Sequence, residues 1–308
     1  MSKVIIHIGY HKTATTSMQD DIFEKQKGIN YLGKSSKWYG CDRGLHQDFV
    51  KAVCSDDEET FSNQYQYLKN RIDAFAKNKD FLISDELLLG DSRDFMGGNV
   101  ALSDRLDRIS KLLSAYDIEV LLTLREYKTC LHSLYVQKYP YINGRDFSNF
   151  CKDPSVLNLY YYFSIYSMLK KRFREVHLLS FEALNKDEDF FKEELSGILG
   201  VDIKSLKVSN KNQKKLSSGK KVSSGFSVRH FIRSIMGENV FRFIRNNKFL
   251  SFFVGPIWDK VSSLSFFDKE IPKISDEEIK QLNEIFYSDM LELKALTNGR
   301  IDYSESFE

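Results

Sequence analysis

The sequence of 308 residues has few cysteines, few prolines and no long apolar segment. Its four cysteines, Cys41, Cys54, Cys130 and Cys151, form no C-x-x-C pair and no spacing with histidine that suits zinc, which argues against a disulfide framework or a zinc module. The four prolines leave no proline-rich linker. No stretch approaches the roughly 18 uninterrupted apolar residues that a membrane span requires.

The sequence also lacks a large excess of either charge, because it has 45 lysines and arginines and 43 aspartates and glutamates, for a net charge of +2. This balance says little about partners, and because the sequence has no recognised nucleic-acid-binding motif, we expect no nucleic-acid partner. The N-terminus enters an apolar strand directly, without the charged and apolar regions of a signal peptide. Together with the free thiols, this predicts a cytoplasmic protein. With 42% hydrophobic residues, the chain can fill the core of one large domain.

The first 27 residues contain the most informative pattern. Residues 3–9 (KVIIHIG) are a β-branched run that predicts a buried parallel strand, which Gly9 ends. From Ala14 to Lys27 the pattern becomes helical, with apolar residues on one face. A strand, a tight turn and a helix start together point backbone N–H groups at an anion, and Lys12 adds a positive charge. The pattern therefore predicts a phosphate-type cradle.

This turn differs from the nucleotide-triphosphate P-loop, because only two residues separate Gly9 from Lys12 and no second glycine precedes the lysine. The motif K-T-A-T-T-S resembles the 5′-phosphosulfate loop of sulfotransferases that use 3′-phosphoadenosine 5′-phosphosulfate (PAPS). The longer string IHIGYHKTATTSMQ resembles the bacterial and carbohydrate-type branch of that family. Ala14 stands where the family more often has glycine, and alanine suits a helical φ but not a positive one.

The resemblance implies a set of residues that bind PAPS, or its product PAP. Lys12 would neutralise the leaving phosphate, and the neighbouring N–H and hydroxyl groups would hold the 5′-phosphate. The predicted residues of this loop are Gly9, Tyr10, His11, Lys12, Thr13, Ala14, Thr15, Thr16 and Ser17.

Arg125 closes a predicted strand, and Ser133 follows eight residues later on the next helix. An arginine fork with a hydroxyl suits a terminal phosphate monoester. The R-x7-S spacing resembles the 3′-phosphate site of the same sulfotransferases. Further on, VHLLSFEALNKDEDFFKEELSGILGVD resembles the family's strand, turn and helix, in which we expect Glu182 to hold the turn. The segment 208–219 resembles the loop over the 3′-phosphate and adenine, and it contributes Asn212, Lys215 and Ser217.

The acceptor hydroxyl needs a base at a neighbouring strand end. Glu86, just past the strand FLIS, fits this position, and glutamate bases occur among carbohydrate members of the family. Asp85, expected to face the opposite side, and His11 and His46 are the alternatives. The resemblance implies transfer of a sulfonyl group to a carbohydrate or glycolipid hydroxyl, without a metal. The acceptor itself stays open, because segments 34–60, 90–98 and 140–165 would build its pocket.

Strands alternate with helices along residues 3–203, which predicts a P-loop-type α/β fold with a central parallel sheet of four to five strands. The expected strands cover residues 3–9, 29–33, 80–84, 118–124 and 175–180. We expect one domain over residues 1–308. It has a core (3–203), a helical basic insertion (204–258) and a closing helix (275–296) that begins with a capping box.

Two rival functions use other features. FLISDE also resembles the strand of a P-loop kinase or NTPase, in which Lys12 would bind phosphate and Asp85 would hold Mg²⁺. Separately, Lys204 to Lys248 contains twelve lysines and arginines and one acid, Glu238. The aromatic and basic segment 226–258 could bind the inner face of a membrane or an anionic polymer. A solvated basic face is the simpler interpretation of the same residues.

Overall fold

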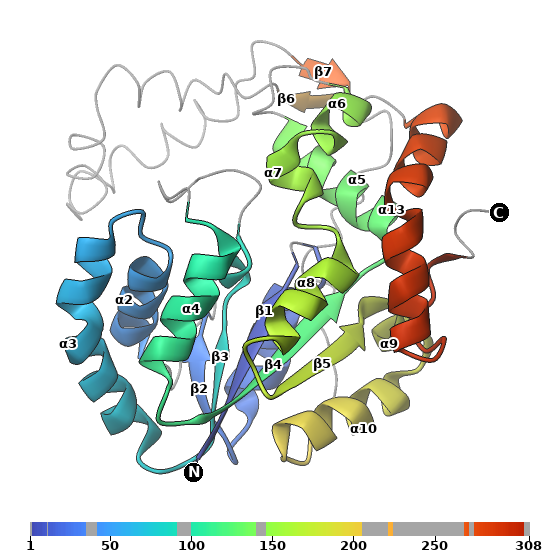
Figure 1. The fold of residues 1–308 in the computed structure, drawn as a ribbon. Helices are drawn as coiled ribbons and strands as arrows, with labels where there is room; N and C mark the ends of the chain where they lie inside the picture. Colours follow the sequence, from blue (N-terminus) through green and yellow to red (C-terminus); the bar gives the residue numbers. More distant parts are fainter. Residues whose placement is uncertain are drawn as a thin grey trace, which may run out of the picture. The chain divides into compact units, whose positions relative to one another are not determined.

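β1 lies at the centre of a five-stranded parallel sheet with the order β2-β3-β1-β4-β5 (Figure 1). The protein is represented by a computed structural model, which describes residues 2–10, 12–34, 42–90, 100–139, 146–204, 221–223, 268–270 and 274–304. The strands are β1 (Lys3–Gly9), β2 (Asn30–Gly33), β3 (Phe81–Ser84), β4 (Asp117–Leu124) and β5 (Glu175–Ser180).

Helices connect these strands, so every pairing in the sheet is parallel. A winding helical segment follows β1: α1 (Thr15–Ser17), the π-helical η1 (Met18–Ile22) and the 3₁₀-helical η2 (Phe23–Lys25). Between β2 and β3 lie α2 (Arg43–Val53) and α3 (Glu58–Ala76). Between β3 and β4 lie η3 (Glu86–Leu88) and α4 (Leu102–Leu112). Further elements are α5 (Tyr127–Lys138), α6 (Phe147–Cys151), α7 (Pro154–Leu157), α8 (Tyr162–Lys170), α9 (Phe181–Lys186), α10 (Glu188–Leu199) and α13 (Asp276–Leu296).

The chain divides into two compact units. The first consists of Met1–Cys130, Cys151–Asn212 and Lys280–Glu308, and it contains the whole five-stranded sheet. The second consists of Leu131–Phe150 and Gln213–Ile279. The expectation of one domain over residues 1–308 stays a prediction.

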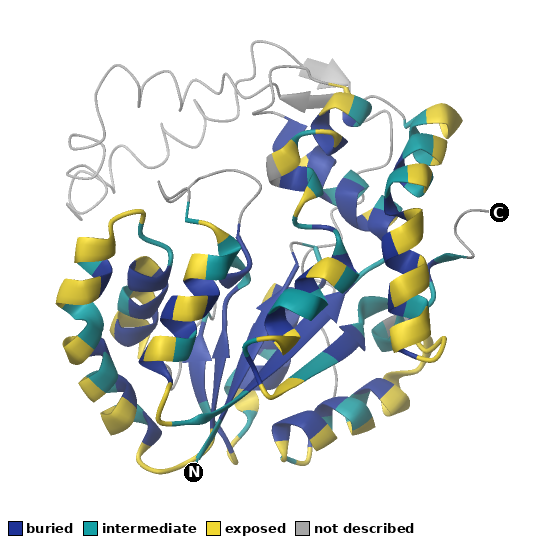
Figure 2. Ribbon diagram, in the orientation of Figure 1, coloured by how far each residue is buried: buried dark blue, intermediate teal, exposed yellow. Residues whose placement is uncertain are grey.

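One face of the sheet packs against the helical segment 15–25 and α10. Strand residues such as Ile5 and Leu121 meet Met18 and Phe23 from the first helix and Phe191 from α10, all of them fully buried. Burying a side chain of this size contributes about 1.5–3 kcal/mol. α3 reaches the sheet from the other side, since the rings of Phe75 and Phe81 lie 6.0 Å apart between centroids. Figure 2 shows the strands almost entirely buried, while the helices expose one side.

Burial on both faces explains why the strand runs are almost continuously apolar. The predicted parallel sheet is confirmed and has five strands, with bounds within two residues of those expected. The expected helix from Ala14 to Lys27 is shorter, because Ala14 is left-handed and Gln26 is extended.

The second unit has its own packing. The ring of Tyr135 lies 5.2 Å from that of Phe147 and 5.5 Å from that of Phe150, between centroids. The predicted capping box of α13 is confirmed: Ser275 N–H donates to Glu278 Oε2 at 2.8 Å, and Glu278 N–H donates to Ser275 Oγ at 3.2 Å. β6 (Lys221–Ser223) pairs antiparallel with β7 (Asp268–Glu270). The rest of the expected basic insertion, apart from Lys204, lies outside the described residues.

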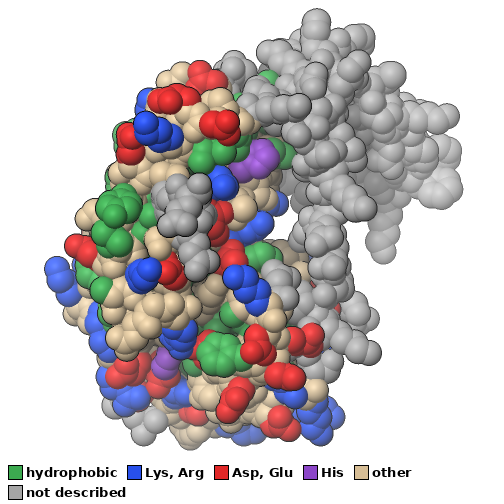
Figure 3. All heavy atoms as spheres, turned by 90° about the vertical axis from the view of Figure 1, so that its right-hand side faces the viewer, with side chains coloured by type: hydrophobic (Ala, Val, Ile, Leu, Met, Phe, Trp, Pro, Cys, Tyr) green, Lys and Arg blue, Asp and Glu red, His purple; other side chains and the backbone are tan. Residues whose placement is uncertain are grey.

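In the described part of the chain, no helix is both long enough and apolar enough to cross a membrane. On the face drawn in Figure 3, the described basic and acidic side chains are interspersed.

Candidate functional site

The end of β1 and the start of the following helix approach each other closely. A Cβ atom at Gly9 would lie 2.5 Å from Thr15 Oγ1 and 3.3 Å from both Thr13 Oγ1 and His7 Cε1. The first of these distances is too short for any other residue unless the Thr15 side chain or the backbone shifts. Glycine therefore lets the helix begin directly against the strand end, where its N–H groups can face a ligand.

The turn between them is held by one carbonyl. Tyr10 O accepts hydrogen bonds from Thr13 N–H at 3.3 Å, from Thr13 Oγ1 at 2.7 Å and from Thr15 Oγ1 at 3.4 Å. Lys12 and Ala14 have positive φ angles of 74° and 57°. Ala14 therefore has the positive φ that alanine tolerates poorly. Two left-handed non-glycine residues in three positions are a local strain of the kind that clusters at functional sites.

The helix start has no side-chain cap, and its first internal hydrogen bond runs from Met18 N–H to Ala14 O. The loop hydroxyls have different surroundings. Thr13 and Thr15 are buried and bond to the loop itself, while Thr16 is exposed. Buried hydroxyls that close the turn shape the cradle rather than project from it.

The remaining loop residues predicted for this site are placed as follows. The ring of Tyr10 is buried among Tyr160 and Tyr162, 5.4 Å and 4.7 Å away between centroids, so only its backbone faces the turn. Ser17 is buried in the first helical turn. His11 lies outside the described residues.

Arg125 joins this loop from the end of β4. Its Nη1 donates to Lys12 O at 2.7 Å, and its guanidinium lies over the ring of Phe181, 4.8 Å from the centroid. Tyr162 donates through its hydroxyl to Arg125 O at 2.7 Å, which fixes the backbone there. Arg125 forms no ion pair with a carboxylate of the described residues, and its Nε is buried without a hydrogen-bond partner. The guanidinium thus keeps donor capacity and charge for another anion.

The other residues predicted for the 3′-phosphate site belong to the second unit or lie outside the described residues. Ser133 is half-buried on α5 and belongs to the second unit, so its pairing with Arg125 stays a prediction. Asn212, Lys215 and Ser217 lie outside the described residues.

Glu182 has the expected structural role. Its carboxylate accepts from Ser180 Oγ at 3.0 Å, from Glu126 N–H at 3.1 Å and from the hydroxyl of Tyr303 at 3.1 Å. It thereby joins the end of β5, the start of α5 and the C-terminal segment.

Beneath the loop lies a polar network that the sequence did not indicate. His7 is fully buried in β1, with Nδ1 2.8 Å from Ser84 Oγ and Nε2 2.9 Å from Thr123 Oγ1. Gln19 Nε2 donates to the same Ser84 Oγ at 3.0 Å. Burial lowers the pKa of His7 to about 3, despite the opposing effect of Glu86, so the imidazole is neutral. The network therefore ties three strand ends and the first helix together.

Two of the candidate bases, Asp85 and Glu86, lie just past the end of β3, and a third, His46, lies on α2. Asp85 caps η3 by accepting from Leu87 N–H at 2.8 Å. Lys34 Nζ lies 2.9 Å from Asp85 Oδ1 and 3.7 Å from Glu86 Oε1, and His46 Nε2 lies 3.1 Å from Asp85 Oδ2. We expected the Asp85 and Glu86 carboxylates to face opposite sides. That expectation is wrong, since both carboxylates lie beside the ammonium group of Lys34.

Exposure separates these candidates. Asp85 is 1% exposed and His46 is 2% exposed, whereas the side chain of Glu86 is 25% exposed. Burial acts to raise the pKa of Asp85, but the hydrogen bond from His46 and the charge of Lys34 outweigh it and hold that pKa below its usual value. Burial acts to lower the pKa of Lys34, and the two carboxylates outweigh it and raise that pKa. Lys34 was missed because it follows a short strand without any motif.

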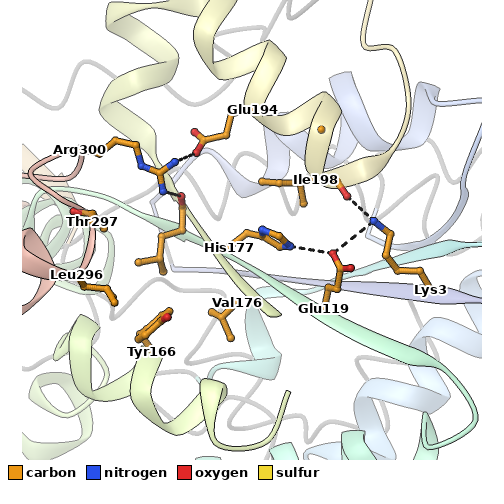
Figure 4. Close-up of a pocket in the computed structure, with 12 residues that line it drawn as sticks. Lys3, Glu119, Tyr166, Val176, His177, Glu194, Ile198, Leu296, Thr297 and Arg300 are labelled. Carbon is orange, nitrogen blue, oxygen red and sulfur yellow. Dashed lines mark hydrogen bonds and ion pairs between the residues drawn. The ribbon is translucent and has the colours of Figure 1, made fainter. Parts of the chain in front are cut away.

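A cavity of about 570 Å³ lies elsewhere in the same unit, beside the starts of β1, β4 and β5 (Figure 4). Its charged groups are paired with one another: Lys3 Nζ lies 3.5 Å from Glu119, His177 Nε2 lies 3.0 Å from Glu119, and Arg300 pairs with Glu194. None of the predicted site residues lines it. In α/β sheets of this kind ligands bind beyond the carboxyl ends of the strands, where the Lys12 loop lies.

No protein-family model matches the sequence, and no curated protein matches it. Among solved structures, the chain is similar to one described as a sulfotransferase from Alicyclobacillus acidocaldarius. The two share 13% identity with a TM-score of 0.48, over 96% of each chain.

Proposed function

We propose that this chain transfers the sulfonyl group of PAPS to an acceptor hydroxyl on a carbohydrate or glycolipid. The observation that carries the proposal is the 2.7 Å hydrogen bond from Arg125 Nη1 to Lys12 O. It brings two sequence-distant motifs, the strained loop and the strand-end arginine, to one place at the carboxyl ends of β1 and β4. Each motif contains a positively charged side chain, Lys12 or Arg125, and PAPS has an anionic group at both its 5′ and its 3′ position.

The residues fit such a donor. A Cβ atom at Gly9 would crowd the turn that forms the predicted phosphate cradle. Arg125 Nε is buried without a hydrogen-bond partner. In the proposal, N–H groups at the helix start and Thr16 hold the 5′-phosphate, and Lys12 neutralises it as it leaves. Arg125 binds the 3′-phosphate, together with Ser133 and the segment containing Asn212, Lys215 and Ser217.

PAPS supplies the sulfonyl group: the acceptor oxygen forms a bond to sulfur, the bond between sulfur and the phosphate oxygen breaks, and PAP leaves. Glu86 takes the acceptor proton, because it is the most exposed of the described candidate bases. Asp85 and His46 hold Lys34 and η3 in place. His11 stays an alternative base.

The kinase or NTPase alternative needs Asp85 to hold Mg²⁺. Asp85 Oδ1 instead accepts from Leu87 N–H and lies beside Lys34, while Oδ2 lies beside His46. The membrane or anionic-polymer alternative depends on the basic tract 204–248 and on segment 226–258, which lie outside the described residues apart from Lys204 and residues 221–223.

Titration calorimetry with PAP, AMP and ATP, each with and without Mg²⁺, tests the proposal. We expect PAP to bind at least about tenfold more tightly than AMP, since the 3′-phosphate adds a charge-assisted contact, and Mg²⁺ to have no effect. Lys12→Ala should weaken PAP at least about tenfold. Lys25→Ala is the matched control, because Lys25 is an exposed lysine of the following helical segment. A preference for ATP with Mg²⁺ would instead support the kinase or NTPase.

A further inference from the structure

α4 contains two buried arginines, one with many protein partners for its guanidinium and one with few. Arg108, 7% exposed, pairs with Glu58 at 2.7 Å and donates to the carbonyls of Ala52, Val53 and Ser55. Its guanidinium is therefore bound by protein groups on every side.

Arg105, three residues earlier and 9% exposed, has one hydrogen-bond partner among the described residues, the carbonyl of Leu87, which accepts from Nη1 at 3.1 Å. Its Nε is buried without a hydrogen-bond partner, and no carboxylate of the described residues pairs with it. A buried guanidinium that lacks a counter-charge is rare, because desolvation of the charge is costly unless an anion compensates it.

The nearby acids do not supply that anion. Asp85 and Glu86 share the ammonium group of Lys34. The head group of Arg105 is flanked instead by a glycine with a φ of 125°, Gly90, at which a Cβ atom would lie 3.1 Å from Nη1. Glycine at this position therefore lets the guanidinium lie directly against the backbone, where a larger residue would crowd Nη1.

The hydrogen bond to Leu87 places the Arg105 head group beside η3, which follows β3 and contains the proposed base. Arg105 bonds to Leu87, which directly follows Glu86, the proposed base, and consecutive Cα atoms lie about 3.8 Å apart. β3, which leads to Glu86, neighbours β1 on one side, whereas β4, which leads to Arg125, neighbours it on the other. The donor phosphates are assigned to the β1 and β4 ends, so they do not account for Arg105.

We infer that Arg105 binds an anionic group of the acceptor, a carboxylate or a phosphate, within about one sugar ring of the hydroxyl that is sulfated. The acceptor would then be an acidic sugar, such as a hexuronate or a phosphorylated hexose. A guanidinium presents two parallel N–H donors that match either group. This inference rests on the proposed function.

The test measures binding of three probes in the presence of PAP: methyl glucoside, methyl glucuronide and methyl glucoside 6-phosphate. We expect one or both anionic probes to bind at least about tenfold more tightly than the neutral one, and the stronger of the two identifies the anion. Arg105→Gln should abolish that preference and leave the affinities for the neutral probe and for PAP unchanged.

Arg108→Gln is the matched control on the same helix. It should lower the melting temperature by about 4 °C or more, since its protein contacts are lost, and should keep the preference for anionic probes. Arg105→Gln should change the melting temperature of the unliganded protein little.

Two outcomes would overturn the inference: no anionic probe binds better than the glucoside, or Arg105→Gln retains the preference. Failure of the proposed function has a different signature. In that case PAP does not bind to any variant, while the binding of the three probes can still be compared without it.

Discussion

Ala14 occupies a backbone conformation that an L-residue adopts at a cost. Its φ of 57° and ψ of 21° are left-handed, and it directly precedes the helix that starts at Thr15. We expect Ala14→Gly to raise the free energy of unfolding by about 0.5–1 kcal/mol, since relief of strain exceeds the added freedom of the unfolded chain. Urea unfolding measures this change.

The matched control is Ala52→Gly, in the last turn of α2, where glycine should lower the free energy of unfolding by about 1 kcal/mol. If both substitutions destabilise the protein equally, Ala14 is not strained in solution.

His7 predicts how stability depends on pH. Its pKa is lowered to about 3 by burial, whereas the unfolded chain should have a pKa near 6.5. The unfolded state therefore binds a proton first as pH falls, and the contribution of neutral His7 is complete above pH 6.5 and is lost between about pH 6.5 and 3. Within this window the free energy of unfolding should fall by about 1 kcal/mol per pH unit from this group.

Unfolding free energies of the wild type and of His7→Asn, measured from pH 4 to pH 7, isolate the contribution of His7 to the pH dependence of stability. The variant should show the shallower slope, because every other titrating group is shared. Equal slopes would mean that the imidazole is not buried in its neutral form.

Single residues also show what a sequence conveys poorly. Lys12 and Arg125 were found because each stands at a fixed place in a motif. His7, Lys34 and Arg105 were not, because their meaning depends on what surrounds them after folding. His7 lies within an apolar run, where nothing in the local pattern indicates its two hydroxyl partners.

At the scale of elements, the junction between β1 and the first helix is the feature on which the site depends. A Cβ atom at Gly9 would lie 2.5 Å from Thr15 Oγ1. We expect Gly9→Ala to destabilise the protein by about 1–3 kcal/mol, as overpacking of a close contact does. Chemical denaturation measures the loss.

Thr15→Ala removes the crowded oxygen, so the double variant should recover part of the loss. A coupling energy of at least about 0.5 kcal/mol is expected from the double-mutant cycle. Strict additivity would mean that the two residues do not touch.

The sheet was the most predictable part of the fold, because its strands are short β-branched runs buried on both faces, as Val4 to Ile8 illustrate. The winding of residues 15–25 from α to π to 3₁₀ was not predictable, since Met18, Ile22 and Phe23 fit a regular helix equally well. Their burial on one face was correct.

At the scale of the whole molecule, the strand order separates two tasks. β1 lies between β4, which leads to Arg125, and β3, which leads to Glu86. In our account the nucleotide binds on the first side and the acceptor on the second, with Lys12 between them. The net charge of +2 does not reveal this arrangement, because the arrangement depends on where the charged residues lie in the fold and not on how many there are.

The central claim is that the Lys12 loop and Arg125 form one site for a nucleotide with a 3′-phosphate. Calorimetry with Arg125→Gln tests it most directly. The account predicts that this variant binds PAP at least about tenfold more weakly than the wild type does, with the affinity for AMP nearly unchanged. Equal affinity of wild type and variant for PAP, or an equal loss for PAP and AMP, would contradict it.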